Sequence, residues 1–92
     1  MQFAYDQDAD ALYVTVSEAV VSRTVEIDPL TMVDVDVNGD PVGIEILRLR
    51  SRQIDLDAIH NRIPLPREVR SYLDLLLGSD DHDAPFQEPL PA

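Results

Sequence analysis

The alternation of apolar and polar residues is clearest over residues 32–47, where it predicts a β-hairpin. Three valines alternate with polar residues in residues 33–37, and Val42, Ile44 and Ile46 alternate in the return segment. The two runs are separated by Asn-Gly-Asp-Pro, and Asn-Gly is a preferred pair for a tight hairpin turn. A two-residue turn and a four-residue loop both place the apolar side chains of the two strands on one face.

The same hairpin predicts a row of carboxylates on its polar face. With a four-residue loop, Val37 lies opposite Val42, and Asp34 lies directly opposite Glu45. Asp36 lies on the same face, and like charges that face each other across two strands are destabilising.

Three arrangements relieve this repulsion, namely a metal ion, a basic partner and the chain's own arginines. A flat exposed face lacks the convergent ligands of a Mg²⁺ or Ca²⁺ site. Neutralisation within the chain requires only opposite charges nearby, so we favour it. The arginines of the next segment are available for it, namely Arg48, Arg50 and Arg52.

Three earlier segments also alternate and predict further strands. Residues 1–5, 12–17 and 23–28 each place their apolar side chains on one side. Past the hairpin, the same parity would turn arginines inward, so the last strand must bulge or end near Leu47. We therefore expect a small antiparallel β-meander of four to five strands.

From residue 55 onward the apolar spacing becomes helical. Asp55 is suited to the N-cap of a short helical turn over residues 56–61. Pro66 is suited to the first position of a second helix over residues 67–77. The apolar side chains of this C-terminal helix form one stripe, which either covers the apolar face of the sheet or makes a dimer contact.

These elements predict an α+β fold in a single domain over residues 1–78. The sheet occupies residues 1–50 and the helical part occupies residues 54–78. Residues 79–92 form an acidic tail that contains prolines, and we expect it to be mobile when free.

Composition and charge restrict the function further. The chain has 92 residues and a net charge of −11, and all seven of its basic residues are arginines. Such a charge repels phosphate backbones, so we expect no nucleic acid partner. The sequence contains no cysteine, no apolar run of membrane-spanning length and no signal-peptide pattern. We therefore expect a cytoplasmic protein without a membrane partner.

The candidates for metal binding and catalysis are weak. Asp6, Asp8 and Asp10 resemble the start of a calcium-binding EF-hand loop, which next requires glycine and glutamate where this chain has Ala11 and Ser17. We therefore expect a turn in which aspartates accept backbone N–H bonds. The sequence has no glycine-rich phosphate loop and no histidine spaced to serve a serine nucleophile. We predict no catalytic residue, no metal ligand and no cofactor.

Two longer motifs extend over the strands. The first is Tyr-Asp at residues 5–6 with Ala-Asp-Ala-Leu-Tyr-Val at residues 9–14. The second is Val-Asp-x-Asp at residues 33–36, with Gly39 and Val-Gly-Ile-Glu-Ile-Leu at residues 42–47. Together they resemble the DUF2283 family of small bacterial proteins, from residue 5 to residue 47.

The resemblance implies a compact antiparallel β-meander with a C-terminal element packed against it. It implies no activity, since the family has none assigned. The genes of some family members look like neighbours of small RelE-like toxin genes. An antitoxin role is therefore suggested by this gene association alone.

The motif residues have structural explanations. Gly43 allows a close approach of a neighbouring group, and the ring of Tyr13 covers it if the two strands adjoin. Glu45 is then placed to accept the hydroxyl of Tyr13 or to pair with an arginine. We assign structural roles to six motif residues, namely Tyr5, Asp6, Asp10, Tyr13, Gly39 and Gly43.

Two functional hypotheses follow. We favour a non-enzymatic protein-interaction module, either a homo-oligomer or an antitoxin-like binder of a small basic toxin. Its interaction candidates are Asp34, Asp36, Glu45, Arg48, Arg50 and Arg52. The alternative is a small metal-dependent enzyme that uses the carboxylates of the sheet face and the N-terminal turn, namely Asp6, Asp10, Asp34, Asp36 and Glu45.

Overall fold

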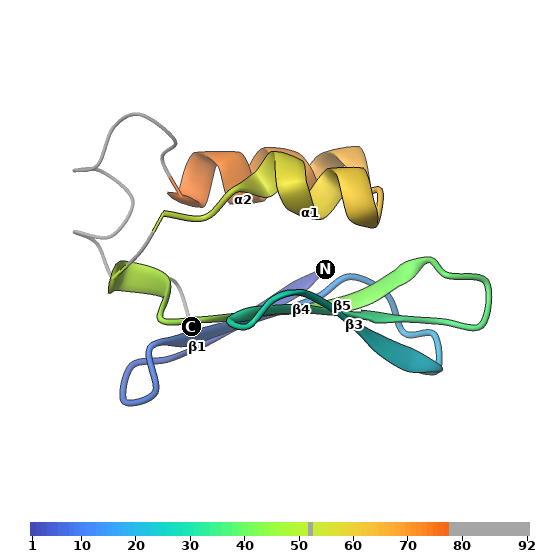
Figure 1. The fold of residues 1–92 in the computed structure, drawn as a ribbon, viewed down its shortest axis with the longest axis horizontal. Helices are drawn as coiled ribbons and strands as arrows, with labels where there is room; N and C mark the ends of the chain where they lie inside the picture. Colours follow the sequence, from blue (N-terminus) through green and yellow to red (C-terminus); the bar gives the residue numbers. More distant parts are fainter. Residues whose placement is uncertain (52, 78–92) are drawn as a thin grey trace.

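The chain folds into a five-stranded antiparallel sheet with two helices on one side of it (Figure 1). The structure, a computed structural model, describes residues 1–51 and 53–77. The predicted α+β fold with an antiparallel sheet and a C-terminal helix is confirmed, whereas the predicted tail over residues 79–92 lies outside the described residues. The strands are β1 (Gln2–Asp6), β2 (Ala11–Thr15), β3 (Arg23–Asp28), β4 (Thr31–Val35) and β5 (Pro41–Leu47). The 3₁₀ turn η1 (Leu49–Ser51) and the helices α1 (Leu56–Arg62) and α2 (Arg67–Leu77) follow.

β5 is the central strand of the sheet, whose order is β1-β2-β5-β4-β3. It pairs antiparallel with β2 on one side and with β4 on the other. The chain leaves β2 and continues at the opposite edge of the sheet in β3, and then returns through β4. The sheet is antiparallel, as predicted, but it is not the predicted simple meander, because β2 and β3 are consecutive in the chain and are not neighbours in the sheet. The hairpin with the strongest sequence signal therefore supplies the two strands to which the others are added.

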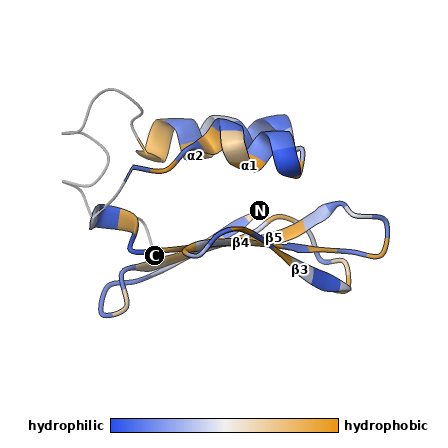
Figure 2. Ribbon diagram, viewed as in Figure 1, coloured by the Kyte–Doolittle hydropathy of each residue, from blue (hydrophilic) through white to orange (hydrophobic). Residues whose placement is uncertain are grey.

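One face of the sheet packs against both helices and forms an aliphatic core. On two of the three inner strands, β2 and β5, the inward side chains of Leu12, Val14, Ile44 and Ile46 are fully buried. Side chains two residues apart share a face of a strand, so the alternating sequence pattern produces this face directly. Apolar residues line the central strands, whereas the β1–β2 turn is hydrophilic (Figure 2). The helices complete the core with Leu56, Ile59, Val69, Leu73 and Leu76.

The β4–β5 hairpin has a three-residue loop. The N–H of Gly39 donates to the carbonyl of Asp36 at 3.0 Å, and the N–H of Asp36 donates to the carbonyl of Asp40 at 2.9 Å. Gly39 has a φ of 87°, and a left-handed glycine commonly closes a loop of this length. The predicted two-residue and four-residue turns are therefore wrong. Val37, which the alternation placed on the apolar face, lies in the loop and is 85% exposed.

A bulge compensates for the odd length of this loop. Val35 pairs with Pro41, whereas Asp34 pairs with Gly43, so the extra residue Val42 is accommodated between these two pairs. A shift of one residue would otherwise turn one strand's apolar side chains to the opposite face. The bulge therefore keeps Val33, Val35, Ile44 and Ile46 on the core face, as predicted, but in a different register.

β5 ends at Leu47, as predicted, because the next residue leaves the extended conformation. Arg48 has a φ of 52°, a left-handed backbone that residues other than glycine adopt infrequently. After this turn Leu49 is buried, and Arg48 and Arg50 are exposed. The turn therefore removes the conflict that would have placed arginines in the core.

The predicted helices are present and lie over the apolar face of the sheet. Asp55 caps α1 by accepting a hydrogen bond from the N–H of Ala58 at 3.0 Å, as predicted. The buried side chains of α2 belong to the core, and Tyr72 stacks on Phe3 of β1 with 3.8 Å between ring centroids. Of the two predicted uses of this stripe, covering the sheet is the one observed.

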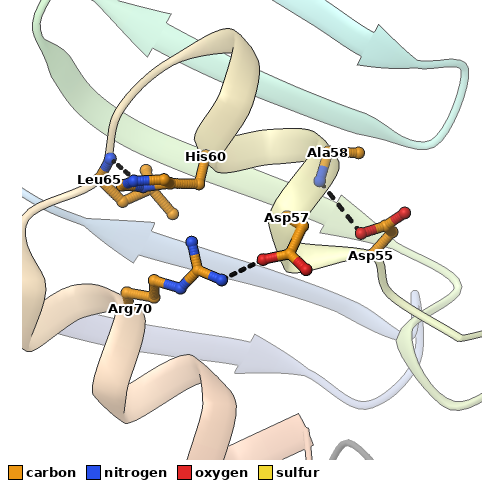
Figure 3. Close-up of polar contacts among 6 residues, drawn as sticks. All are labelled: Asp55, Asp57, Ala58, His60, Leu65 and Arg70. Carbon is orange, nitrogen blue, oxygen red and sulfur yellow. Dashed lines mark hydrogen bonds and ion pairs between the residues drawn. The ribbon is translucent and has the colours of Figure 1, made fainter.

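Polar contacts join the two helices (Figure 3). Arg70 of α2 forms an ion pair with Asp57 of α1. In the connection between the helices, the N–H of Leu65 donates to Nδ1 of His60 at 3.0 Å. His60 is therefore a structural residue that holds the chain between α1 and α2.

Leu73→Ala should destabilise the protein much more than Leu75→Ala. Leu73 is fully buried, and the cavity left by its truncation should cost about 2–5 kcal/mol. Leu75 lies on the same helix but is 79% exposed, so its truncation should change stability by less than about 0.5 kcal/mol. Equilibrium unfolding in urea measures both values, and equal losses would contradict the packing of α2 on the sheet.

Candidate functional site

The sequence motifs come together at two places in the sheet. The first is the corner where the β1–β2 turn meets the end of β5, which we call the Asp10 corner and which consists of Tyr5, Asp10, Leu49 and Arg50. The second is the face of the sheet opposite the helices, which we call the open face. The strand register places these residues on the open face: Gln2, Ala4, Asp6, Ala11, Tyr13, Thr15, Thr24, Glu26, Met32, Asp34, Gly43, Glu45 and Leu47.

In the Asp10 corner, Asp10 ties the β1–β2 turn to the residues after β5. Its carboxylate accepts a hydrogen bond from the hydroxyl of Tyr5 at 2.6 Å and one from the N–H of Arg50 at 3.2 Å. Its carbonyl accepts a third from the N–H of Leu49 at 3.0 Å. Asp10 has a φ of 51°, a conformation that persists where several contacts hold it. The carboxylate of Asp10 therefore organises the chain.

The neighbouring groups of this corner are also engaged. Oδ1 of Asp6 accepts hydrogen bonds from the N–H groups of Asp8 and Ala9, as predicted for the aspartate-rich turn. The guanidinium carbon of Arg50 lies 5.5 Å from the centre of the Tyr5 ring, within the range of a cation–π contact. Burial raises the pKa of Tyr5, and so do its hydrogen bond to Asp10 and the charge of Asp10, against the lowering effect of Arg50.

On the open face, the side chain of Tyr13 extends from β2 across Gly43 of β5 to β4. A Cβ at residue 43 would lie 2.0 Å from the hydroxyl oxygen of Tyr13 and 2.6 Å from its Cζ, so the ring occupies the place of a side chain. The hydroxyl donates to Oδ2 of Asp34 at 2.9 Å. The hydroxyl of Thr24 on β3 donates to Oδ1 of the same carboxylate at 2.6 Å. These contacts join four adjacent strands in one row.

The contact between Tyr13 and Gly43 is the one expected from the sequence, but the acceptor of the tyrosine hydroxyl is different. Asp34 accepts the hydrogen bond, rather than Glu45. The reason is the register, since the bulge places Asp34 opposite Gly43 and places Glu45 opposite Met32. The prediction that Asp34 lies directly opposite Glu45 is therefore wrong.

Sequence reasoning did not identify Thr24 as a member of this network. The alternation in residues 23–28 placed it on the polar face, which was the available signal. Its partner Asp34 lies opposite in the β3–β4 pair, and only the register of that pair shows this.

The open face is acidic. No ion pair joins its carboxylates to an arginine within residues 1–51 and 53–77. Two of the three arginines that follow β5 therefore do not neutralise the carboxylates of the open face, contrary to the prediction. Arg48 and Arg50 are exposed and make no such pair, and Arg52 lies outside the described residues. The charged residues of the open face are Asp6, Glu26, Asp34 and Glu45.

The carboxylates of the metal-enzyme hypothesis are not brought together. Asp10 lies in the Asp10 corner, and Asp34 lies in the middle of the open face. Asp36 lies in the hairpin loop, where Oδ1 accepts the N–H groups of Asn38 and Asp40 at 2.9 and 3.0 Å. In the part of the chain that the structure describes, no group of three or more His, Cys, Asp or Glu side chains is placed to hold a metal ion.

The fold and the site define a small antiparallel sheet domain with one face covered by helices. Residues 2–50 match the family model DUF2283, described as a protein of unknown function. This match covers more than half of the chain and contains the sheet, both motifs and the Asp10 corner, so the chain belongs to the DUF2283 family. No curated protein and no solved structure is significantly similar to the chain. Among the described residues, neither helix has the length and apolar character needed to cross a membrane.

Gly43→Ala should destabilise the protein by about 1–3 kcal/mol, because the added methyl group overlaps the Tyr13 side chain. In a Tyr13→Ala background the same substitution should cost much less, since the space is then vacant. Gly39→Ala is the matched control, because no heavy atom lies within 4 Å of a Cβ there and its cost comes from the positive φ alone. Additive losses for positions 13 and 43 in urea unfolding would show that the two residues do not share this space.

The hydroxyl of Tyr13 should lose its proton at a higher pH than an ordinary tyrosine. Burial, the hydrogen bond to Asp34 and the charges of Asp34 and Glu45 raise the pKa of Tyr13 from 10.0 to about 12. Because the pKa is higher in the folded chain than in the unfolded chain, the stabilisation is complete below pH 10 and is lost as the pH rises toward 12. Tyrosinate absorbance measures the ionisation, and Tyr13→Phe should flatten the fall in stability over this window. The same fall in both proteins would contradict the shift.

Proposed function

We propose that this protein is a non-enzymatic interaction module that binds a basic protein partner through its open face. The observation that carries the proposal is the unequal cover of the sheet (Figure 1). Both helices lie on one face, and no other element of residues 1–51 and 53–77 covers the opposite face. An exposed face on a rigid sheet presents side chains in fixed positions, which is what recognition of a partner requires.

The charges of the open face favour a cationic partner. Glu26 and Glu45 lie opposite Met32 on the two neighbouring strands, and Asp34 is the next residue of β4 on the same face. Within the described residues, the carboxylates of Glu26 and Glu45 have neither a hydrogen bond nor an ion pair. Both oxygens of Asp34 accept hydrogen bonds from neutral hydroxyls, so its charge is not neutralised. Charges of one sign attract and orient a partner of the opposite sign.

Tyr13 and Met32 add surface suited to the side chain of a lysine or arginine. One side of the Tyr13 ring lies against Gly43, and Glu45 lies opposite Tyr13 in the β2–β5 pair. Tyr13 and Met32 are each half-buried, so part of each remains accessible. An aromatic ring attracts a cation, and the thioether of Met32 accommodates an aliphatic stem. A cationic side chain therefore finds aromatic, apolar and acidic groups within one patch.

Charge makes a second copy and the chain's own C-terminal segment less suitable occupants. Residues 79–92 contain four acidic residues and no arginine, and a second open face carries the same carboxylates. Either would place like charges together, which is unfavourable. A small basic toxin satisfies the charge requirement, and an antitoxin-like role is the specific form of this proposal.

Co-expression with the product of the neighbouring gene tests the antitoxin-like role. Light scattering of the purified material determines whether a complex forms. Growth with the neighbouring gene alone is compared with growth when both genes are expressed. A complex together with relief of growth inhibition supports the role, and the absence of both would refute it.

Removing charge from the open face should weaken such a complex. Glu26→Gln with Glu45→Gln removes two carboxylates that have no partner among the described residues, so affinity and its dependence on salt should both fall while the fold is retained. The matched control is Glu68→Gln with Asp74→Asn, which removes two exposed charges from α2 on the other side of the sheet. Calorimetry at low and high salt measures both pairs. Equal weakening by the two pairs would point to net charge rather than to the open face.

A further inference from the structure

The loop of the β4–β5 hairpin contains an asparagine followed by glycine. Asn38 is exposed, and within the described residues its side-chain amide makes no hydrogen bond. The adjacent Val37 is 85% exposed, so the loop projects into solvent. We propose that Asn38 is a site of spontaneous deamidation, and that the hydrogen bonds of Asp36 restrain the reaction.

The reaction requires water as its only co-reactant. The backbone nitrogen of Gly39 gives up its proton to solvent and attacks Cγ of Asn38, which forms a five-membered imide. The side-chain nitrogen takes up a proton and leaves as ammonia when its bond to Cγ breaks. Water then opens the imide at either carbonyl carbon, and the products are aspartate and isoaspartate. No oxidant or reductant takes part.

Residue 39 offers little steric resistance to this attack. Gly39 has no Cβ, and a Cβ built there would have no heavy atom within 4 Å. The other asparagine of the chain, Asn61, is also exposed, but it lies in α1 and is followed by Arg62. The helix holds the backbone of Asn61, and the side chain of Arg62 crowds the nitrogen that would attack. The chain therefore contains one accessible asparagine and one hindered asparagine.

Asp36 holds the loop in a conformation that opposes the reaction. Its carbonyl accepts the N–H of Gly39 at 3.0 Å, and that proton must be removed before the nitrogen can attack. Its Oδ1 atom accepts the N–H groups of Asn38 and Asp40. The loop must therefore open locally before Asn38 reacts, and the stability of the turn limits how often this happens. Asp36 acts on the reaction as a positioning residue.

Deamidation would change the hairpin permanently. Aspartate at position 38 adds a carboxylate to a loop that already contains Asp36 and Asp40. Isoaspartate also lengthens the backbone of the loop by one atom. Loop length sets the register of a hairpin, and the hydrogen bond from the N–H of Asp36 to the carbonyl of Asp40 closes this loop at 2.9 Å. The isoaspartate form should therefore have a less stable β4–β5 hairpin.

Incubation of the full chain at mildly alkaline pH, followed by proteolysis and mass spectrometry, measures both asparagines in one sample. We expect Asn38 to deamidate at least about tenfold faster than Asn61, which corresponds to a barrier lower by about 1.4 kcal/mol. An isoaspartate-specific methyltransferase assay identifies the second product. Equal rates at the two asparagines would overturn the proposal.

Variants of the loop test the restraint. Asp36→Ala should accelerate the reaction of Asn38 severalfold, and Asp36→Ser, which keeps an acceptor oxygen, should restore a slower rate. The rate at Asn61 reports on global unfolding, so acceleration at both asparagines would overturn the local restraint. An unchanged rate at Asn38 in Asp36→Ala would overturn it as well.

Discussion

The contact of the Tyr13 ring with Gly43 is the interaction that organises the open face of the sheet. A glycine in a central strand weakens pairing, because it has no side chain to pack and more conformational freedom to lose. Here the ring of a neighbouring strand fills that space, and its hydroxyl fixes the carboxylate of Asp34. Asp34 in turn holds Thr24, so β2, β5, β4 and β3 are linked on the face that the helices do not cover.

The two faces of the sheet have different roles because their side chains differ. The aliphatic face is buried beneath α1 and α2, and burial of apolar area is the main source of its stability. Hydrogen bonds between side chains hold the open face, and within the described residues its carboxylates form no ion pair with an arginine. Like charges in one patch reduce stability, so the charge of these carboxylates does not contribute to folding, and the partner proposed above would supply the opposite charge.

The Asp10 corner lies where the chain leaves the sheet and continues to the helices. Asp10 and Arg48 both have positive φ values, and hydrogen bonds join Asp10 to the two residues that follow Arg48. The corner turns the chain out of the sheet, after which it continues to the helices above the apolar face (Figure 1). The DUF2283 match ends at residue 50, within this corner. The family segment is therefore the sheet with its exit turn, and the helices of this chain follow it.

The sequence by itself determined which segments form strands and helices and which of their side chains face the core. Period-two alternation marked the strands, helical spacing marked residues 67–77, and Asp55 marked the start of α1, because each signal depends only on residues near one another in the chain. The contact of Tyr13 with Gly43 could also be predicted from the sequence, because an aromatic ring of a neighbouring strand commonly covers a glycine within a strand. Only the tertiary structure decided which residues face each other. Asn-Gly is compatible with loops of different lengths, and a three-residue loop with a bulge at Val42 placed Asp34 opposite Gly43, where its carboxylate accepts the hydrogen bond of the Tyr13 hydroxyl. The partners of Asp34 and Asp10 come from distant segments, and these meet only when register and burial are satisfied together.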